Sequence, residues 1–561
     1  MRKMVKKISS KDRLGWLLLI FFLALGGVLR IAFLDKIPQG FNWDEASIGY
    51  NGYSLLKTGK DEFGRPWPIF LEAFGEYKTG IYSMLLVPVI KLFGLSIFTV
   101  RAPNAIFGCF LILASFYLGL QAFKKALPAS LVAGLVAISP WAVHTSRFAL
   151  EWYFGMALAV GGFGFLLASR KKRYLMLPAA LFLAVSFYSY HALRLLVPLL
   201  LFSYAVIFRK EVLKEKKILF TSLIIGFLVL LPLMNSMRSN KWFSRALDVA
   251  IFGSKEVESE LMEDMYRHTV SGLPFVRVFN NKVVFYGKEI LDKYLAHFSP
   301  QFLFSGQDVT PRIGIEKVGK LYYVSLAFLV FGLYEILRKR NKLNRFLLLW
   351  LFLAPLPSSL TTDSPHALRS LLMIPVLQII TVYGMVVSYR YLRLKKSRLI
   401  IPFFAFFSLF YFVGFVYFLW RYFLFYPEDS ANFWQDGHKQ MVEKFKNYRD
   451  RFEKIVITTH YGQPHIFVAF FMPVDPNFYQ REVAKPDQQE IFNERIPHLG
   501  KIEFRQISAD DFYLPNTLVI TENRAAPENL PPLDVVKTAN RFYEEPVLFK
   551  IFDTNRLTGE K

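Results

Sequence analysis

Long apolar runs alternate with short polar segments along most of this 561-residue chain, and the pattern changes only towards its C-terminal end. A membrane-spanning helix needs about 20 mostly apolar residues. The run 14–34 has this length and follows a basic leader without a small-residue cleavage site, so we interpret it as a retained anchor. Further spans are predicted at 98–123, 126–143, 149–169, 174–190, 192–208, 218–235, 318–337, 346–360, 370–391 and 399–425.

The segment after residue 425 has the pattern of a water-soluble fold. Residues 454–460, 514–521 and 547–552 predict strands, and 464–471 predict a helix. The segment is about 130 residues long, which suits one small domain. The sequence therefore predicts an all-α polytopic membrane protein with a transmembrane domain at 14–425 and a small C-terminal α/β domain at 426–561.

Composition agrees with a chain that lies largely in lipid, because 53% of the residues are hydrophobic and 58 are Phe. The net charge of +24 alone would be typical of nucleic-acid binding. However, six short clusters before or between the spans carry the whole surplus, at 1–13, 124–125, 170–173, 209–217, 338–345 and 390–398. The charge therefore marks membrane topology, and we expect no nucleic-acid partner. The single cysteine excludes an intrachain disulfide and a Cys-based zinc site.

The basic clusters predict the orientation by the positive-inside rule. All six clusters lie on one side of the membrane, the cytoplasmic side, if the region 80–123 crosses the membrane once. The segment 80–94 would then be a partial or re-entrant helix. The alternative is two full crossings there, which would reverse everything from residue 124 onwards. We favour the first arrangement because it puts the loop 35–79, the large loop 236–317 and the C-terminal domain outside. It predicts a multi-pass cell-membrane protein with about 11 to 13 transmembrane helices.

The first outer loop carries the sharpest candidate chemistry, the adjacent carboxylates Asp44 and Glu45. One interpretation is helix capping, with Asp44 as the N-cap of a helix at 45–56. The other is a catalytic carboxylate, and the two are compatible. Glu76 and Lys78 follow where the chain re-enters the membrane. For Lys78 the simpler interpretation is an interfacial anchor.

The tetrapeptide His-Ala-Leu-Arg occurs twice, at 191–194 and 366–369, and each copy opens a predicted span at its outer end. On a helix, positions i and i+3 share a face, so His191 pairs with Arg194 and His366 with Arg369. Arg147 is a third outer arginine. Outer arginines oppose the positive-inside bias, and guanidinium groups match phosphate bidentately. These residues therefore favour a phosphate site over snorkelling to lipid headgroups.

These motifs resemble those of the GT-C glycosyltransferases. The resemblance rests on the first span followed by Asp44-Glu45, the re-entry at Glu76-Tyr77-Lys78, and Phe93-Gly94 with Val100-Arg101-Ala102-Pro103. More narrowly, the chain is similar to the protein-O-mannosyltransferase family and to its relative, the aminoarabinose transferase that modifies lipid A. The likeness covers residues 14 to 425, and it implies a GT-C fold.

The resemblance also implies an inverting transferase that moves a hexose, mannose or pentose from a polyprenyl-monophosphate donor to an outer hydroxyl of a protein, lipid or glycan. Asp44 would be the base, with Glu45 beside it, and Glu76 and Lys78 would match the family's acid-plus-lysine element. The family continues Lys-Pro-Pro, whereas this chain has Lys78-Thr79-Gly80, and Glu76 is one residue further from the lysine than in the lipid A enzyme. The sequence therefore leaves open whether Glu76 contacts a metal or the acceptor. It identifies no cofactor with certainty, and a divalent metal stays open as one.

Such a transfer needs a base at the hydroxyl and cations at the leaving phosphate. Lys78, Arg147, His191, Arg194, His366 and Arg369 are the candidate cations. The competing class is a polytopic transporter or lipid flippase for a glycolipid, which would more often show wide internal repeats and charges near the bilayer midplane. In the tail, His460-Tyr461-Gly462-Gln463-Pro464-His465 joins a predicted strand to a helix. A structural turn is the simpler interpretation there, and glycan binding is the alternative.

Overall fold

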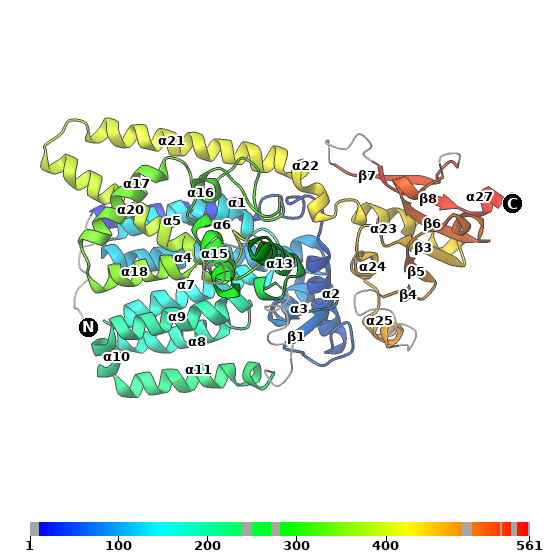
Figure 1. Cartoon of the computed structure of the whole chain (residues 1–561), viewed down its shortest axis with the longest axis horizontal. Coiled ribbons are helices and arrows are strands. Elements are labelled where there is room, and N and C mark those ends of the chain that lie inside the picture. Colours follow the sequence, from blue (N-terminus) through cyan, green and yellow to red (C-terminus); the bar gives the residue numbers. More distant parts are fainter. Residues whose placement is uncertain are drawn as a thin grey trace. The chain divides into compact units, whose positions relative to one another are not determined.

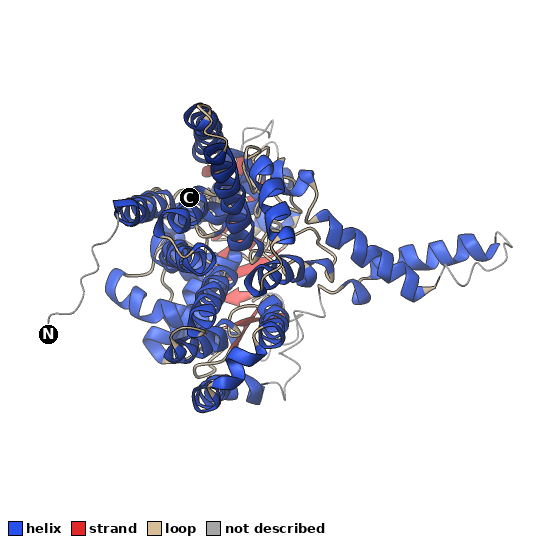
Figure 2. Cartoon of the chain, turned by 90° about the vertical axis from the view of Figure 1, so that its left-hand side faces the viewer, coloured by secondary structure: helices blue, strands red, loops and turns tan. Residues whose placement is uncertain are grey.

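The computed structural model describes residues 10–236, 249–270, 281–484, 496–527, 530–539 and 547–558. It divides into two compact units. The helical unit comprises Met1–Ala32, Asn104–Ser146 and Glu151–Arg421, and the mixed unit comprises Phe33–Pro103, Arg147–Leu150 and Tyr422–Lys561. Helices predominate (Figure 2). Within the described residues, every strand belongs to the mixed unit. Parts of the predicted N-terminus (1–9) and of the loop 236–317 (237–248, 271–280) lie outside the described residues.

The helical unit contains the predicted spans as roughly parallel helices (Figure 1). Six helices of the described chain are long and apolar enough to cross a membrane. They are α1 (Ser10–Ile31), α4 (Ile97–Phe123), α7 (Glu151–Ser169), α11 (Lys216–Ser236), α20 (Met373–Leu394) and α21 (Ile400–Trp420). Shorter apolar helices of this unit include α5 (Ala126–Ile138), α8 (Met176–Ser186) and α9 (His191–Ile207), and the short apolar helix α3 (Ile81–Phe93) belongs to the mixed unit. The polytopic membrane class is confirmed, and the number of crossings stays a prediction.

Prolines explain why some predicted spans are interrupted. The run 126–143 ends as α5 at Ile138, and α6 (Pro140–Thr145) begins anew with the Ser139 side chain as its cap. A proline lacks the N–H that would continue α5 and is favoured in a first helical turn. Pro355 similarly separates α18 (Lys342–Leu353) from α19 (Leu356–Ser359). The remaining helices of this unit are α10 (Arg209–Lys214), α13 (Lys255–Val270), α15 (Lys282–Ala296), α16 (Pro300–Phe304) and α17 (Ser325–Arg338).

Arg30, near the end of α1, donates hydrogen bonds to the carbonyl groups that the break between α5 and α6 leaves without a helical partner. Its Nη1 donates to Gly26 O at 3.0 Å and Ala137 O at 3.1 Å, and its Nη2 donates to Val136 O at 3.3 Å. The last carbonyls of a helix have no partner within the helix. A buried arginine at a helix end therefore replaces the hydrogen bonds that Pro140 prevents, and it fixes α1 against α5.

The mixed unit combines the first outer loop with the C-terminal segment. The loop folds into α2 (Trp43–Thr58) and a hairpin of β1 (Phe70–Ala73) and β2 (Glu76–Thr79). The C-terminal part has a six-stranded sheet in the order β4-β5-β3-β6-β8-β7. Its elements are α22 (Tyr426–Ser430), α23 (His438–Lys446), β3 (Lys454–Thr458), α24 (Pro464–Phe471), α25 (Pro476–Val483), β4 (His498–Leu499), β5 (Ile502–Arg505), β6 (Thr517–Glu522), β7 (Asp534–Lys537), β8 (Val547–Asp553) and α27 (Asn555–Thr558).

The C-terminal α/β fold is confirmed, and the predicted helix 464–471 matches α24. All six residues of β6 are buried, as expected for a strand inside a sheet. Contacts across the unit join the first loop to this segment, since Phe41 lies 4.7 Å from Phe470 and Tyr50 lies 4.9 Å from Tyr479 between ring centroids. The first outer loop and the tail thus form one packed body, which the sequence had divided between two domains.

Two glycines let α17 and α20 approach at backbone distance. A Cβ added at Gly384 would lie 1.9 Å from Phe328 O, and one added at Gly332 would lie 1.9 Å from Ile380 O. Small residues at helix crossings permit such close packing within membranes.

We expect Gly384→Ala to destabilise the protein by about 1–3 kcal/mol, because the added methyl group has to displace a backbone carbonyl. The matched control is Gly226→Ala in α11, where a Cβ meets nothing within 4 Å. The control should leave the unfolding temperature unchanged or slightly raised, since alanine is the better helix former. Thermal unfolding of the purified protein in detergent measures both, and equal effects would contradict the close crossing.

Candidate active site

The N-terminus of α2 positions the two predicted carboxylates differently. Asn42 is the N-cap, and its side chain accepts a hydrogen bond from Asp44 N at 3.0 Å. Glu45 completes a capping box, because its carboxylate accepts from Asn42 N at 3.5 Å. The predicted capping role of Asp44 is therefore wrong: the Asn42 side chain reaches the backbone N–H groups first, and Asp44 lies within the first turn.

Glu45 is fully buried and forms a two-pronged ion pair with Arg101. Its Oε1 accepts from Arg101 Nε at 2.9 Å and its Oε2 from Arg101 Nη2 at 2.8 Å. Its Oε1 also accepts from Ala149 N at 2.8 Å. A buried carboxylate is stable only when it is paired and hydrogen-bonded, and both conditions are met. Glu45 is thus held by α4 and by the segment before α7, and its oxygen atoms are occupied.

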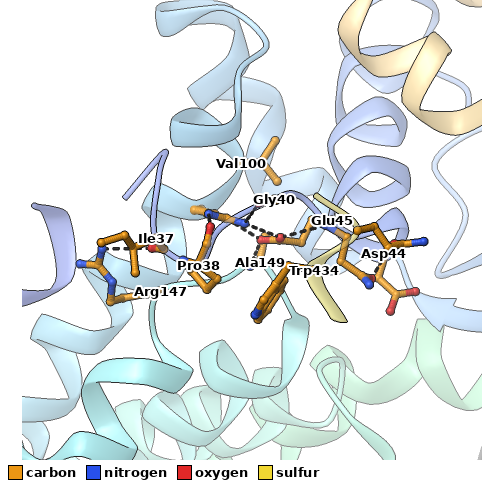
Figure 3. A network of polar contacts seen from close by, with 12 residues as sticks. Ile37, Pro38, Gly40, Asp44, Glu45, Val100, Arg147, Ala149 and Trp434 are labelled. Atoms are coloured by element: carbon orange, nitrogen blue, oxygen red, sulfur yellow. Dashed lines mark hydrogen bonds and ion pairs between the residues drawn. The ribbon is translucent and has the colours of Figure 1, made fainter. Parts of the chain in front are cut away.

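The other hydrogen bonds of the Arg101 guanidinium hold the loop that precedes α2. Its Nη1 donates to Leu34 O at 3.1 Å and Pro38 O at 3.0 Å, and its Nη2 donates to Gly40 O at 2.8 Å. The guanidinium also lies 5.8 Å from the ring of Trp434. Figure 3 shows this network, with Glu45, Pro38, Gly40 and Ala149 gathered around it and the Asp44 side chain pointing away from it.

Asp44 is instead paired with Lys78, which the β1–β2 hairpin brings to the start of α2. The Asp44 side chain is 17% exposed and that of Lys78 is 13% exposed. The Lys78 Nζ also lies 5.2 Å from the ring of Phe74. Glu76 and Lys78 lie on the same face of β2, because alternate strand residues share a face. Asp44 is thus the more accessible of the two adjacent carboxylates, beside a fixed cation.

Arg147 lies in the same unit and is fully buried. Its Nη2 donates to Phe33 O at 3.2 Å and Ile37 O at 3.1 Å. Its guanidinium lies 5.6 Å from the ring of Tyr422 and 5.4 Å from that of Phe423. These partners give Arg147 a role in holding the loop that follows α1 (Figure 3). The Arg147 guanidinium is therefore held by structural contacts within the mixed unit, whereas the two histidines of the repeated motif belong to the helical unit.

The two His-Ala-Leu-Arg copies lie close together in the helical unit, joined by aromatic side chains that the sequence did not single out. The Tyr190 ring lies 3.8 Å from the ring of His191 and 4.0 Å from that of Trp152. The ring of Trp152 lies 5.4 Å from that of His366. A pairing of a tryptophan in α7 with a tyrosine before α9 has no local pattern that would predict it, so only the structure reveals it.

The arginines of both copies are anchored near this aromatic group. Arg369 is 4% exposed, and its Nη1 donates to Thr361 Oγ1 at 2.7 Å and Asp363 O at 2.9 Å. Its Nε donates to the Tyr190 hydroxyl at 3.4 Å. Arg194 donates from Nε to a carbonyl in the turn before α9 at 3.2 Å. These bonds hold both guanidinium groups in fixed orientations.

The histidine of the second copy is buried and uncharged at neutral pH. The His366 backbone N–H donates to Ser358 Oγ at 3.2 Å and His297 Nε2 at 3.4 Å. Burial, helped by the nearby charge of Arg369, lowers the pKa of His366 well below its ordinary value. Burial also lowers the pKa of His297 to about 4. The positive charge of this cluster is therefore carried by its arginines.

A buried carboxyl that the sequence analysis missed links α2 to the C-terminal segment. Glu62 Oε1 accepts from Asn51 Nδ2 at 2.7 Å and from Ser47 Oγ at 3.2 Å. Its Oε2 accepts from the Tyr479 hydroxyl at 3.3 Å. Burial raises the pKa of Glu62 from its ordinary value of 4.5 to about 7. Only the fold distinguishes this glutamate from the many on the surface.

The predicted residues thus divide between the units: the mixed unit contains Asp44, Glu45, Glu76, Lys78 and Arg147, of which Asp44 and Lys78 pair directly, and the helical unit contains His191, Arg194, His366 and Arg369. Within the described ranges, no three His, Cys, Asp or Glu side chains are grouped so that they could hold a metal ion.

No family model and no curated protein matches this sequence. Solved structures of similar fold were found. ArnT from Cupriavidus metallidurans in the apo state has a TM-score of 0.54 at 11% identity, covering 96% of this chain and 98% of ArnT. The same protein bound to undecaprenyl phosphate has a TM-score of 0.52 at 12% identity, with the same coverage.

The archaeal oligosaccharyltransferase AglB from Archaeoglobus fulgidus, in complex with an inhibitory peptide and a dolichol-phosphate, has a TM-score of 0.50 at 14% identity. The match covers 92% of this chain and 70% of AglB. These likenesses show the fold: this chain shares the fold of ArnT and of AglB, in agreement with the fold that the sequence resemblance implied.

The Arg101–Glu45 pair should dominate the stability of the mixed unit. We expect Arg101→Met to cost about 3–5 kcal/mol, because it leaves the Glu45 charge buried without its partner. Lys78→Met removes the cation of a more exposed pair and should cost no more than about 1 kcal/mol. The unfolding temperatures of the two variants provide the comparison, and similar losses would contradict the central role of Arg101.

Glu62 should make stability depend on pH. A carboxyl whose pKa is raised by folding binds its proton more tightly in the folded state, so its stabilising contribution is complete below pH 4.5 and is lost as the pH rises to about 7. The loss amounts to about 3 kcal/mol over this window. The glutamine variant Glu62→Gln should remove this part of the slope. Parallel stability curves for the two proteins between pH 4.5 and 7.5 would contradict the assignment.

Proposed function

We propose that this chain is a membrane glycosyltransferase that moves a sugar from a polyprenyl-monophosphate donor to an acceptor hydroxyl on the extracytoplasmic face. The observation that carries the proposal is Asp44, a partly exposed carboxylate at the start of α2 that is oriented by Asn42 and paired with Lys78. The shared fold supports the donor class, since ArnT has been solved with undecaprenyl phosphate and AglB with dolichol-phosphate.

Asp44 is the general base. The acceptor oxygen attacks the anomeric carbon while Asp44 removes its proton, and the bond between that carbon and the donor phosphate breaks. The lipid phosphate leaves with the bonding electron pair, and a single displacement inverts the configuration of the sugar. Lys78 pairs with Asp44 and holds its carboxylate in place. Glu76, on the same face of β2, contacts the acceptor or a metal.

The phosphate is held by the cluster of His191, Arg194, His366 and Arg369. Negative charge grows on the phosphate as the bond breaks, and preoriented cations stabilise it without reorganising. Arg369 meets this requirement, because Thr361, Asp363 and Tyr190 fix its guanidinium. Glu45 and Arg147 serve the reaction indirectly, through the loop and helix that carry Asp44.

The orientation follows from the basic clusters. The N-terminus is cytoplasmic and the C-terminal domain is extracytoplasmic, in a multi-pass protein of the cell membrane. Under this orientation the hairpin and α2 face the side where a lipid-linked sugar meets its acceptor.

We expect Asp44→Asn to lower transfer by about 10²–10⁴-fold, because the amide cannot accept the acceptor's proton. The assay incubates the purified protein with a panel of polyprenyl-phosphate sugars and measures the released lipid phosphate. Asp35→Asn is the matched control, since Asp35 is an exposed carboxylate of the same loop.

Full activity of Asp44→Asn would overturn the assignment of the base. If the wild-type protein moved a labelled lipid-linked sugar across a vesicle membrane without cleaving it, the lipid flippase would replace the transferase.

A further inference from the structure

The C-terminal sheet has the topology that places a binding crevice between β3 and β6. β5, β3 and β6 are parallel neighbours in that order. The chain leaves β3 towards β5 on one side, whereas it leaves β6 towards β8 on the other. In open α/β sheets, ligands bind outside the carboxyl ends of adjacent strands whose connections diverge in this way. The loop after β3 is the His460–His465 motif, for which the sequence left glycan binding open.

Polar side chains gather at this point from both strands. Glu522, the last residue of β6, accepts from Thr458 Oγ1 through Oε2 at 2.6 Å. Its Oε1 lies 3.9 Å from His460 Nδ1. The His460 side chain is 50% exposed, whereas that of Glu522 is 10% exposed. A recessed carboxylate therefore has a solvent-accessible imidazole beside it.

Two further oxygen atoms of the same loop are buried without a hydrogen-bond partner in the part of the chain that the structure describes. They are Thr459 Oγ1 and Gln463 Oε1. The two residues are only 3% and 8% exposed. Buried polar atoms of a folded protein are almost always satisfied by protein, water or ligand. Because these two oxygen atoms lack a donor within the protein, a ligand that carries hydroxyl groups could supply one.

The loop also touches the start of the helix that carries Asp44. Gly462 has a φ of +108° and lies against Trp43, where an added Cβ would meet the indole at 2.2 Å. Gln435 bridges the two, because its Oε1 accepts from Trp43 N at 2.8 Å and its Nε2 donates to Tyr461 O at 3.2 Å. The loop is therefore fixed next to Trp43, the residue that precedes Asp44.

We propose that the carboxyl ends of β3 and β6, with Glu522, His460, Thr459 and Gln463, form a binding subsite for a saccharide. This inference rests on the proposed function, in which the subsite holds the glycan acceptor whose hydroxyl reaches Asp44. A carboxylate, an imidazole, a hydroxyl and an amide oxygen together offer acceptors for several sugar hydroxyl groups. The carboxylate repels phosphate, so the lipid donor binds elsewhere. Trp43 and Tyr461 provide apolar ring surface next to these polar groups.

The test measures sugar binding to the full-length protein in lipid nanodiscs by saturation-transfer NMR. The probes are the methyl glycosides of glucose, galactose, mannose and N-acetylglucosamine, and a short peptide rich in Ser and Thr is the comparison ligand. No lipid donor is present, so the result does not depend on whether the chain transfers sugar. A failure of this subsite is thereby distinguished from a failure of the Asp44 assignment.

Two variants probe the subsite. Glu522→Gln should raise the Kd of the bound glycoside about tenfold or more, because it removes a charged acceptor. Gln463→Met keeps the side-chain length and removes the unpartnered oxygen, so it should weaken binding while the unfolding temperature stays equal or rises. The matched control is Glu453→Gln, an exposed carboxylate just before the amino end of β3, which should bind as the wild type does.

Binding of one glycoside that is lost in both variants and kept in the control supports the proposal. Saturation of the peptide alone, binding of no glycoside, or equal binding by Gln463→Met and wild type would each overturn it. A fall in the unfolding temperature of Gln463→Met would show that its oxygen is satisfied within the protein, which would also overturn it.

Discussion

The mixed unit depends on one buried ion pair, between Arg101 near the start of α4 and Glu45 in the first turn of α2. Burying the pair is unfavourable unless every polar atom of both side chains has a hydrogen-bond partner. The remaining partners are backbone groups: Arg101 donates to carbonyls of the loop 34–40, and Glu45 accepts from Ala149 N. Through its bonds to the loop 34–40 and to Glu45, the Arg101 guanidinium fixes both the loop that leads into α2 and the first turn of α2. The same arrangement sets the position of Asp44, whose own carboxylate pairs with Lys78.

The two adjacent acids consequently lie in different environments, Glu45 against the buried Arg101 and Asp44 beside the less buried Lys78. Both oxygen atoms of Glu45 are occupied by the arginine and by backbone N–H groups. The difference between the two acids comes from helix geometry, because successive side chains on a helix point about 100° apart and only one of them can face the interior. All four buried or half-buried arginines of these sites donate to backbone carbonyls, and they differ in their surroundings: Arg101 and Arg147 lie in the mixed unit, whereas Arg369 and Arg194 lie near the histidine and aromatic cluster of the helical unit.

The sequence predicted the elements well wherever a local pattern determines them. Apolar runs located the helices, and proline explains why the runs at 126–143 and 346–360 are divided. Asp44 and the two His-Ala-Leu-Arg copies were found as motifs. The cap at Asn42, the Tyr190–Trp152 link and the burial of Glu62 were not predictable, because each depends on which distant residue arrives next to it. The packing of the first loop on the tail was missed for the same reason.

The hydrogen bond between Tyr479 and Glu62 connects residues that are 417 positions apart in the sequence, so its two partners are synthesised at different times. The ribosome adds about 5–20 residues per second, so the loop with Asp44 waits about 20–80 s for the helix that covers it. During that interval Tyr50 and Phe41 lack their aromatic partners from α25 and α24. The aromatic contacts that pack the first loop against the C-terminal segment therefore form only after most of the chain has been synthesised.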